Sequence, residues 1–219
     1  MADPADPHLA RWNQRFSAAD YVFGTAPNAF LKAQAHRLKP GMTALAVADG
    51  EGRNGVFLAR QGLAVLSVDF SPVGHAKARR LAEQHGVKLA TECADLAEWQ
   101  WGAARFDVVA GIFIQFAAPE LRTRIFAGMR SALRPGGLVL IQGYRPQQLG
   151  YGTGGPKDAA LLYTANMLRA NFAGFEILHL REHDSEIHEG GGHDGMSALV
   201  DLVACKPAPA KESGAAHGA

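Results

Sequence analysis

A glycine-rich turn between two apolar runs constrains the fold of this chain more than any other feature. The run Ala44–Val47 is typical of a buried parallel strand, and residues 50–55 shortly after it read Gly-Glu-Gly-Arg-Asn-Gly. A helical segment follows, and a second apolar run closes on Asp69, about twenty residues beyond the first glycine. The order of strand, glycine-rich turn, helix, strand and acid predicts a βαβ unit with a ligand-binding edge.

That edge suits a cofactor containing adenosine. Glycines let the backbone approach a ligand closely, and the start of the helix presents free N–H groups. Asp69 stands where an acid can accept hydrogen bonds from ribose hydroxyls. Residues 50–55 satisfy the fingerprint G-x-G-x-x-G, but this motif is shared by folds that bind dinucleotides and folds that bind S-adenosylmethionine (SAM). The turn alone therefore leaves the two cofactors open.

Composition narrows the class of protein. At 219 residues, 47% hydrophobic and 20% charged, the chain suits one α/β domain with a full core. The formal net charge of +1 argues against a nucleic-acid surface, which needs clustered Lys and Arg. Two cysteines, Cys93 and Cys205, give neither a disulfide framework nor zinc spacing. No apolar run is long enough to cross a membrane. We expect a cytoplasmic protein that binds no nucleic acid and no membrane.

The ends of the chain differ in composition from its middle. The predicted boundaries are a disordered leader at 1–8, a single domain at 9–207 and a disordered tail at 208–219. A short helix over Leu9–Phe16 carries Trp12 and Arg15, and further aromatic residues follow it. Residues 9–40, which include the first core helix, therefore form either a lid that excludes water from a site or a staple that fixes the N-terminus to the domain.

Strands and helices alternate beyond Asp69, which favours a doubly wound sheet. The predicted elements are a helix at 71–86, a strand at 87–91, a strand at 105–113, a helix at 119–133, a tight turn at 134–137 and a strand at 138–141. A long loop at 142–157, a helix at 159–171 and two β segments at 175–188 and 196–206 complete the chain. We predict a Rossmann-like α/β fold, with a mostly parallel seven-stranded sheet that ends in a C-terminal antiparallel hairpin.

Three features favour SAM over a dinucleotide. The terminal antiparallel hairpin differs from the six parallel strands of a dehydrogenase. Asp95 and Leu96 follow the third strand, where an acid and an apolar side chain could hold the amino group and ring of an adenine. The sequence Leu133-Arg134-Pro135-Gly136-Gly137-Leu138 before the fifth strand matches a motif common in SAM-dependent methyltransferases.

With these features the chain resembles a small class I SAM-dependent methyltransferase. It is most similar to the tellurite-resistance and thiopurine-methyltransferase-like branch, which methylates small molecules. The matching segments are 12–16, 23–31, 49–54, 68–71, 133–137 and 190–193. The elements Pro-Asn-x-Phe-Leu, at 27–31, and Gly-Glu-Gly-Arg-Asn, at 50–54, are the most specific to this branch.

The resemblance implies a set of residues that bind the cofactor. Gly50, Gly52 and Asn54 would approach the methionine moiety, Asp69 the ribose, and Asp95 and Leu96 the adenine. The predicted set also includes Asp49, Glu51, Phe70, Ile112, Trp12 and Arg15. Many class I enzymes place an acid two residues before the first glycine, but Ala48 occupies that position here. The contact to the methionine ammonium would therefore come from Asp49 or from backbone carbonyls.

The methyl acceptor would bind at the carboxyl ends of the strands. His193, in the glycine-rich loop of the hairpin, is either an acceptor-side catalytic residue or the cap of a mobile turn. Arg145, after the fifth strand, is either a clamp for an anionic acceptor or an ordinary solvated arginine. No Asn-Pro-Pro-Tyr or Pro-Cys pair follows the fourth strand, where Ile112, Phe113 and Phe116 suit a small or apolar acceptor instead.

A metal site is not expected. Strand alternation puts His179 and His183 on one face of the hairpin and His188 on the other, so the histidines do not converge. We predict a methyltransferase that acts on a small-molecule acceptor by in-line displacement, with a thiol, selenium or tellurium compound favoured because a soft nucleophile needs little beyond positioning. The alternatives are an NAD-binding oxidoreductase and a non-catalytic SAM-binding regulator. Monomer and homodimer are both compatible with the sequence.

Overall fold

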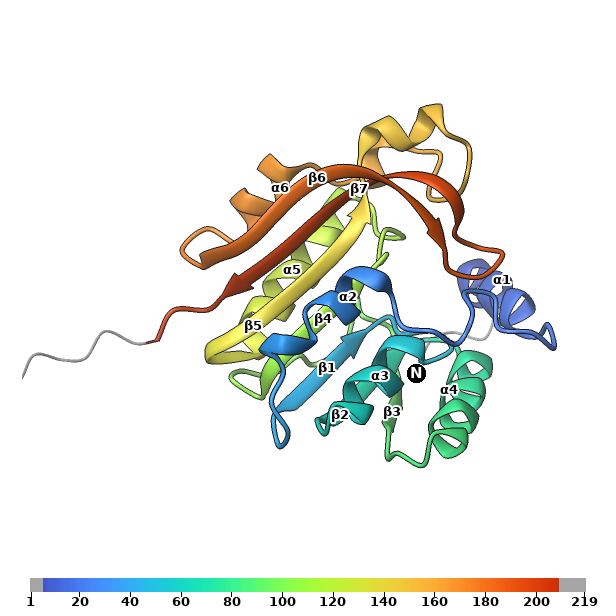
Figure 1. Ribbon diagram of the computed structural model, residues 1–219, viewed down its shortest axis with the longest axis horizontal. Coiled ribbons are helices and arrows are strands. Elements are labelled where there is room, and N and C mark those ends of the chain that lie inside the picture. Colours follow the sequence, from blue (N-terminus) through green and yellow to red (C-terminus); the bar gives the residue numbers. More distant parts are fainter. Residues whose placement is uncertain (1–5, 209–219) are drawn as a thin grey trace, which may run out of the picture.

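The computed structural model of the protein describes residues 6–208, and a seven-stranded sheet runs through its centre. The strands lie in the order β3-β2-β1-β4-β5-β7-β6 (Figure 1). Their bounds are β1 Thr43–Val47, β2 Ala64–Asp69, β3 Ala90–Cys93, β4 Phe106–Ile112, β5 Leu133–Tyr144, β6 Glu176–His188 and β7 Asp194–Cys205. The first five strands pair in parallel, and β7 is antiparallel to both β5 and β6. The predicted fold class is confirmed.

Helices cover both faces of the sheet, and three of the four connections between the parallel strands carry a helix, whereas the connection from β3 to β4 does not. They are α1 Pro7–Phe16, α2 Ala29–Ala33, α3 Arg53–Arg60, α4 Pro72–Gln84, α5 Pro119–Ala132 and α6 Ala165–Asn171, with short 3-10 helices η1 Ala35–Arg37, η2 Pro146–Gly150 and η3 Ala159–Leu161. Local sequence starts several of them: Asp6, Asn28, Ser71 and Thr164 each cap a helix by accepting a backbone N–H.

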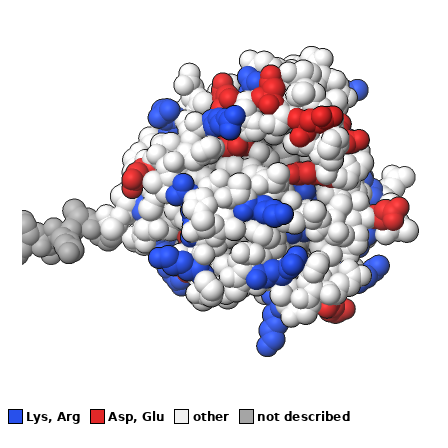
Figure 2. All heavy atoms as spheres, viewed as in Figure 1, with Lys and Arg blue, Asp and Glu red and all other residues white. Residues whose placement is uncertain are grey.

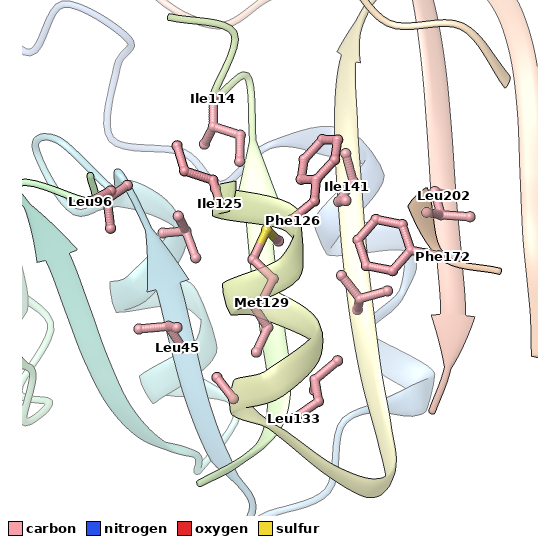
Figure 3. Packing of buried hydrophobic residues seen from close by; sticks show 14 of the residues in the cluster. Leu45, Leu96, Ile114, Ile125, Phe126, Met129, Leu133, Ile141, Phe172 and Leu202 are labelled. Atoms are coloured by element: carbon pink, nitrogen blue, oxygen red, sulfur yellow. The ribbon is translucent and has the colours of Figure 1, made fainter. Parts of the chain in front are cut away.

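The core consists of two main clusters, one on each face of the sheet. Figure 3 shows α5 laid along the sheet, with Phe126 and Met129 directed at β4 and β5, and with Phe172 of the α6 region against Leu202 of β7. The opposite cluster joins α2 and α3 to the other face of the same strands. Because the central strands are covered on both sides, they read as continuous apolar runs in the sequence.

Several element boundaries differ from the predicted ones. Residues 134–137 belong to β5, where they form an irregularity in its pairing with β4 instead of a separate turn. The predicted helix at 159–171 is wrong at its centre, because η3 and α6 are separate helices and Thr164 caps the second. The third strand begins later than predicted, at Ala90, and α1 begins at Pro7. Residues 1–5 of the predicted leader and residues 209–219 of the predicted tail lie outside the described residues.

The long loop predicted at 142–157 is shorter than expected. Pairing of Tyr144 with Leu199 extends β5 through residue 144, and η2 then covers residues 146–150. The hydrogen-bond partners that extend β5 come from β7, more than fifty residues away along the chain, so no local pattern reveals them.

Candidate functional site

The glycine-rich turn and Asp69 meet at the carboxyl ends of β1 and β2. One carboxylate oxygen of Asp69 accepts the N–H of Gly50 at 2.9 Å, and the other accepts the N–H of Ser71 at 2.9 Å. Burial raises the pKa of Asp69, and these two N–H donors oppose that effect. A carboxylate oxygen offers more than one lone pair, so both oxygens can accept a further hydrogen bond. This donor set fits the ribose hydroxyls of an adenosine cofactor.

The glycines of the turn are required for different reasons. Gly52 has φ +87°, and a Cβ there would lie 2.5 Å from the Cβ of Ala78, so this glycine lets α4 approach the turn. A Cβ at Gly55 would lie 2.3 Å from the Asp49 carboxylate. Gly50 has φ +57°, and the ring of Phe16 lies 3.1 Å from the position of its Cβ. Only Gly50 therefore faces a side chain of α1.

Asp49 and Glu51, which we predicted to contact the cofactor, both bond to other groups of the protein. The Asp49 carboxylate accepts the N–H of Gly55 at 3.1 Å and the hydroxyl of Ser67 at 2.9 Å. Glu51 forms a buried ion pair of 2.6 Å with Lys77 and accepts the N–H of Val22 at 2.8 Å. Glu51 thus fastens the N-terminal segment to the glycine-rich turn.

The N-terminal segment lies over this turn. The ring of Phe16 is buried against Gly50 and Gly74, and Trp12 packs beside it with 5.2 Å between ring centroids. The Lys77 ammonium donates to the carbonyls of Ala18 and Asp20 at 2.9 and 2.7 Å, which anchors the chain directly after α1. The segment from Trp12 to Val22 therefore lies against the predicted cofactor edge and is also fastened there.

A buried polar network joins the hairpin loop to the turn. The Glu189 carboxylate pairs with Arg53 at 2.7 Å and accepts the Asn28 side-chain amide at 3.0 Å and the N–H of Ala29 at 3.0 Å. Asn28 also donates its side-chain amide to Gln142 at 2.6 Å and its backbone N–H to Asn54 at 3.0 Å. Our prediction missed the role of Arg53, Asn28 and Glu189. The available signal was that they belong to, or directly precede, the matching segments 23–31, 49–54 and 190–193.

His193 lies in an aromatic cluster at the carboxyl ends of β4 and β5. Its ring stands edge-on to Phe113 and Phe23, with centroid distances of 4.2 and 4.6 Å, and Tyr144 lies 5.6 Å away. Burial, together with the positive charges of Arg53 and Arg15, lowers the pKa of His193 to about 3. The imidazole is therefore neutral near pH 7. The sequence prediction named His193 and missed Tyr144.

Arg145 does not join this cluster. Successive side chains on a strand point to opposite faces, and Tyr144 takes the face of His193. The Arg145 guanidinium pairs with Asp184 of β6, which also accepts the hydroxyl of Tyr151 at 2.9 Å. Arg145 is thus engaged on the hairpin, away from His193.

The remaining predicted residues lie along the same edge with varied exposure. Leu96 is buried in the core cluster that contains α5, and Asp95 accepts the N–H of Ala97 at 2.9 Å. Phe70, Ile112 and Trp12 are half-buried. Arg15 is exposed, and its guanidinium lies 5.2 Å from the Trp12 ring centroid and 5.0 Å from that of Phe23.

Three further features of the described residues bear on the kind of site: surface charge, possible metal ligands and possible membrane-spanning helices. On the face shown in Figure 2, acidic and basic side chains are both present, and the basic ones do not merge into one continuous patch. Within residues 6–208 there is no group of three or more His, Cys, Asp or Glu side chains that could hold a metal ion. In the same part of the chain, none of the helices is both long and apolar enough to cross a membrane.

Asp49 and His193 are expected to give opposite pH dependences of stability. Burial raises the pKa of Asp49 to about 7, so the folded state holds an extra proton between about pH 4 and 7 and loses stability as the pH rises. His193 excludes a proton between about pH 3 and 6.5, so its contribution to stability increases as the pH rises.

In Asp49→Asn, urea unfolding from pH 4 to 6.5 should show a free energy that rises more steeply than in the wild type, by up to about 1.4 kcal/mol per pH unit. His193→Gln should change the slope the other way, and parallel profiles for all three proteins would contradict both assignments.

The strand order, the glycine-rich turn and the acid at the end of β2 define a Rossmann-like methyltransferase fold. Residues 44–137 match the family model described as a methyltransferase domain. No curated protein matches the chain. Residues 44–137 therefore carry the match to a methyltransferase domain, and SAM is the cofactor that such a domain implies.

Solved structures share the fold at low sequence identity. One, from work on the conversion of a disulfide bond into a thioacetal group during echinomycin biosynthesis, is 19% identical with a TM-score of 0.74, over 93% of this chain and 92% of that one. TehB from Haemophilus influenzae is 19% identical with a TM-score of 0.68, over 90% and 66%. The N-methyltransferase NodS from Bradyrhizobium japonicum WM9 is 11% identical with a TM-score of 0.64, over 92% and 98%.

Proposed function

We propose that this protein transfers a methyl group from SAM to a small-molecule acceptor, with a soft nucleophile such as a thiol, selenium or tellurium compound favoured. The observation that carries the proposal is the neutral aromatic cluster around His193 at the carboxyl edge of the sheet. SAM supplies a methyl group on a positively charged sulfonium, which a nucleophile can displace in line. The protein's part is to align the acceptor and to exclude water.

The lowered pKa of His193 favours a soft nucleophile as the acceptor. A general base works best when its pKa lies near the working pH, whereas the pKa of His193 is lowered to about 3. An alcohol or a protonated amine would need such a base, but a thiolate or selenolate arrives with its lone pair free. His193 would therefore contact and orient the acceptor instead of taking its proton.

On the cofactor side, we propose that Asp69 receives the ribose hydroxyls and that the turn at Gly50 lies against the methionine moiety. Asp49 and Glu51 already accept protein donors, so backbone carbonyls of the turn are better placed to accept the methionine ammonium. Because Phe16 rests on Gly50, α1 would shift as the cofactor enters, while the anchor at Lys77 keeps residues 18–22 in place.

We also propose that the protein belongs to the tellurite-resistance and thiopurine-methyltransferase-like branch of the methyltransferases. One structural neighbour comes from work on the conversion of a disulfide bond into a thioacetal group, and another is TehB. Others are described as an N-methyltransferase and a [4+2]-cyclase. A fold shared by proteins with such different descriptions does not by itself choose an acceptor, so the choice rests on the aromatic cluster.

Calorimetric titration tests the cofactor and turnover tests the acceptor. We expect SAM and S-adenosylhomocysteine to bind with micromolar affinity and NADH to give no signal. Methylation should then be followed with thiol, selenol, tellurite and amine acceptors, and thiols or the heavier chalcogen compounds should be turned over fastest. NADH binding without SAM binding would support the oxidoreductase alternative. SAM binding without turnover of any acceptor would support the non-catalytic regulator.

A further inference from the structure

Two buried polar atoms without partners lie in the aromatic cluster. The hydroxyl of Tyr144 and Nδ1 of His193 make no hydrogen bond to any described residue, although Tyr144 is 1% exposed and His193 is 7% exposed. The hydroxyl of Ser197 lies close enough to influence the Tyr144 hydroxyl, but it donates to the carbonyl of Gly195, and the geometry between the two hydroxyls is not that of a hydrogen bond. A buried polar group without a partner costs free energy, so such groups are rare in folded proteins unless a ligand supplies the missing bond.

Phe113, whose ring packs against both Tyr144 and His193, is held in an unfavourable backbone conformation. Its φ is +54°, in the left-handed region that bulky side chains rarely adopt. Its N–H donates to the carbonyl of Gln142 at 2.8 Å, and its ring lies 4.7 Å from Tyr144 and 4.2 Å from His193 between centroids. Strain of this kind is concentrated at sites where ligands bind. The conformation of Phe113 places its apolar ring beside the side chains of Tyr144 and His193, which carry the two unpartnered atoms.

The main chain of Gly154 and Gly155 lies over Tyr144. A Cβ at Gly155 would lie 2.7 Å from the Tyr144 ring, and one at Gly154 would lie 3.2 Å from its hydroxyl oxygen. Gly154 also forms an isolated bridge with His193. Gly152, Gly154 and Gly155 all have positive φ, so this stretch depends on conformations that glycine adopts readily. Glycines here allow the main chain to lie directly against Tyr144.

Charges around the cluster disfavour a cationic ligand. Burial, Arg53 and Arg15 together keep His193 unprotonated. Arg53 is paired with Glu189, whereas Arg15 makes no ion pair with another described residue and lies against the rings of Trp12 and Phe23. The burial and the positive charge that disfavour an imidazolium also disfavour an ammonium group on a ligand.

We propose that Tyr144 is a specificity-determining residue that donates a hydrogen bond to the nucleophilic atom of the methyl acceptor, and that the site selects acceptors with an apolar body and no positive charge. This inference rests on the proposed methyltransferase function. Burial raises the pKa of Tyr144, so its hydroxyl stays protonated and available as a donor at neutral pH.

For a thiol acceptor, the step balances without a proton transfer to the protein. The thiol proton leaves to solvent as the thiolate forms. The thiolate lone pair makes the new bond to the methyl carbon, the bond from that carbon to the sulfonium sulfur breaks, and its electron pair remains on that sulfur. Tyr144 holds the thiolate by a hydrogen bond and neither gains nor loses a proton. Since that bond exists before methyl transfer, it acts chiefly on acceptor binding.

Tyr144→Phe tests the proposal because it removes only the hydroxyl. With thiophenol as acceptor, we expect kcat/KM to fall by about 10- to 100-fold, mostly through KM, since a hydrogen bond to a charged partner is lost. The calorimetric Kd for SAM should not change, and the melting temperature should hold or rise because an unsatisfied buried group is removed. The matched control is Tyr163→Phe. That tyrosine is also buried, but its hydroxyl donates to the carbonyl of Ile114 at 3.2 Å, so this variant should lose thermal stability and keep its KM for thiophenol.

The wild-type enzyme tests the charge preference. Thiophenol should be methylated with at least about 10-fold higher kcat/KM than cysteamine, whose ammonium group the site would disfavour. An unchanged KM in Tyr144→Phe, a lowered melting temperature in that variant, or a preference for cysteamine would overturn the inference while leaving the methyltransferase proposal intact. A wild-type protein that binds SAM but methylates neither thiol would also overturn it. Failure of the wild type to bind SAM would overturn the proposed function itself.

Discussion

Replacing Asp69 with asparagine should weaken SAM binding by about 100-fold or more. The Asp69 carboxylate accepts the N–H groups of Gly50 and Ser71 and, in our proposal, the ribose hydroxyls. Asparagine has one acceptor oxygen, so its amide group would face one of these N–H donors, and the charge-assisted bonds to the ribose would be lost. A 100-fold loss corresponds to about 2.7 kcal/mol, within the range expected for hydrogen bonds to a charged group. Titration calorimetry measures it directly.

Asp107→Asn is the matched control for this prediction. Asp107 is also a carboxylate within the sheet, but it lies near the start of β4, where it accepts the N–H of Thr43 at 2.8 Å and pairs with Arg134 at 2.9 Å. That is the end of the sheet opposite the cofactor edge, so Asp107→Asn should bind SAM as the wild type does. Wild-type affinity in Asp69→Asn would exclude Asp69 from the cofactor site, and equal losses in both variants would indicate a general effect on folding.

Arg53→Met should lower the free energy of unfolding by about 3–5 kcal/mol, because it leaves the carboxylate of Glu189 buried without its ionic partner. Both side chains of this pair are 8% exposed and lie 2.7 Å apart. Asn28 and Ala29 would still donate to Glu189, but they carry no charge to offset its burial. Urea unfolding measures the loss. Adding Glu189→Gln should recover part of it, since the second change removes the stranded charge.

A surface ion pair provides the comparison. Arg134 and Asp107 lie 2.9 Å apart with side chains 43% and 28% exposed, so Arg134→Met should cost less than about 1 kcal/mol. If Arg53→Met cost no more than Arg134→Met, the buried network would not be what fastens the hairpin loop. A large loss in Arg53→Met would show that the buried network stabilises the loop that Glu189 and His193 bound.

Local sequence was sufficient to predict the order of the strands and helices that position the site. The alternation of apolar runs with amphipathic segments indicates the strand and helix order, because each element's period depends on residues only a few positions apart. Gly50 and Asp69 could be placed at one edge for the same reason, since parallel strands joined by a crossover bring their carboxyl ends together. Helix starts at Asn28 and Ser71 likewise follow from side chains that bond within their own turn.

The contacts between side chains that lie far apart in the sequence were decided only by the tertiary structure. Glu51 is adjacent to the turn, yet it pairs with Lys77 of α4 and holds Val22 of the N-terminal segment. Tyr144 and Arg145 are neighbours in sequence, but β7 pairing directs them to opposite faces, so one joins His193 and the other joins Asp184. Strand period and turn chemistry are local properties of the chain, whereas the partner of a buried polar group depends on how distant segments pack, which no local sequence pattern specifies.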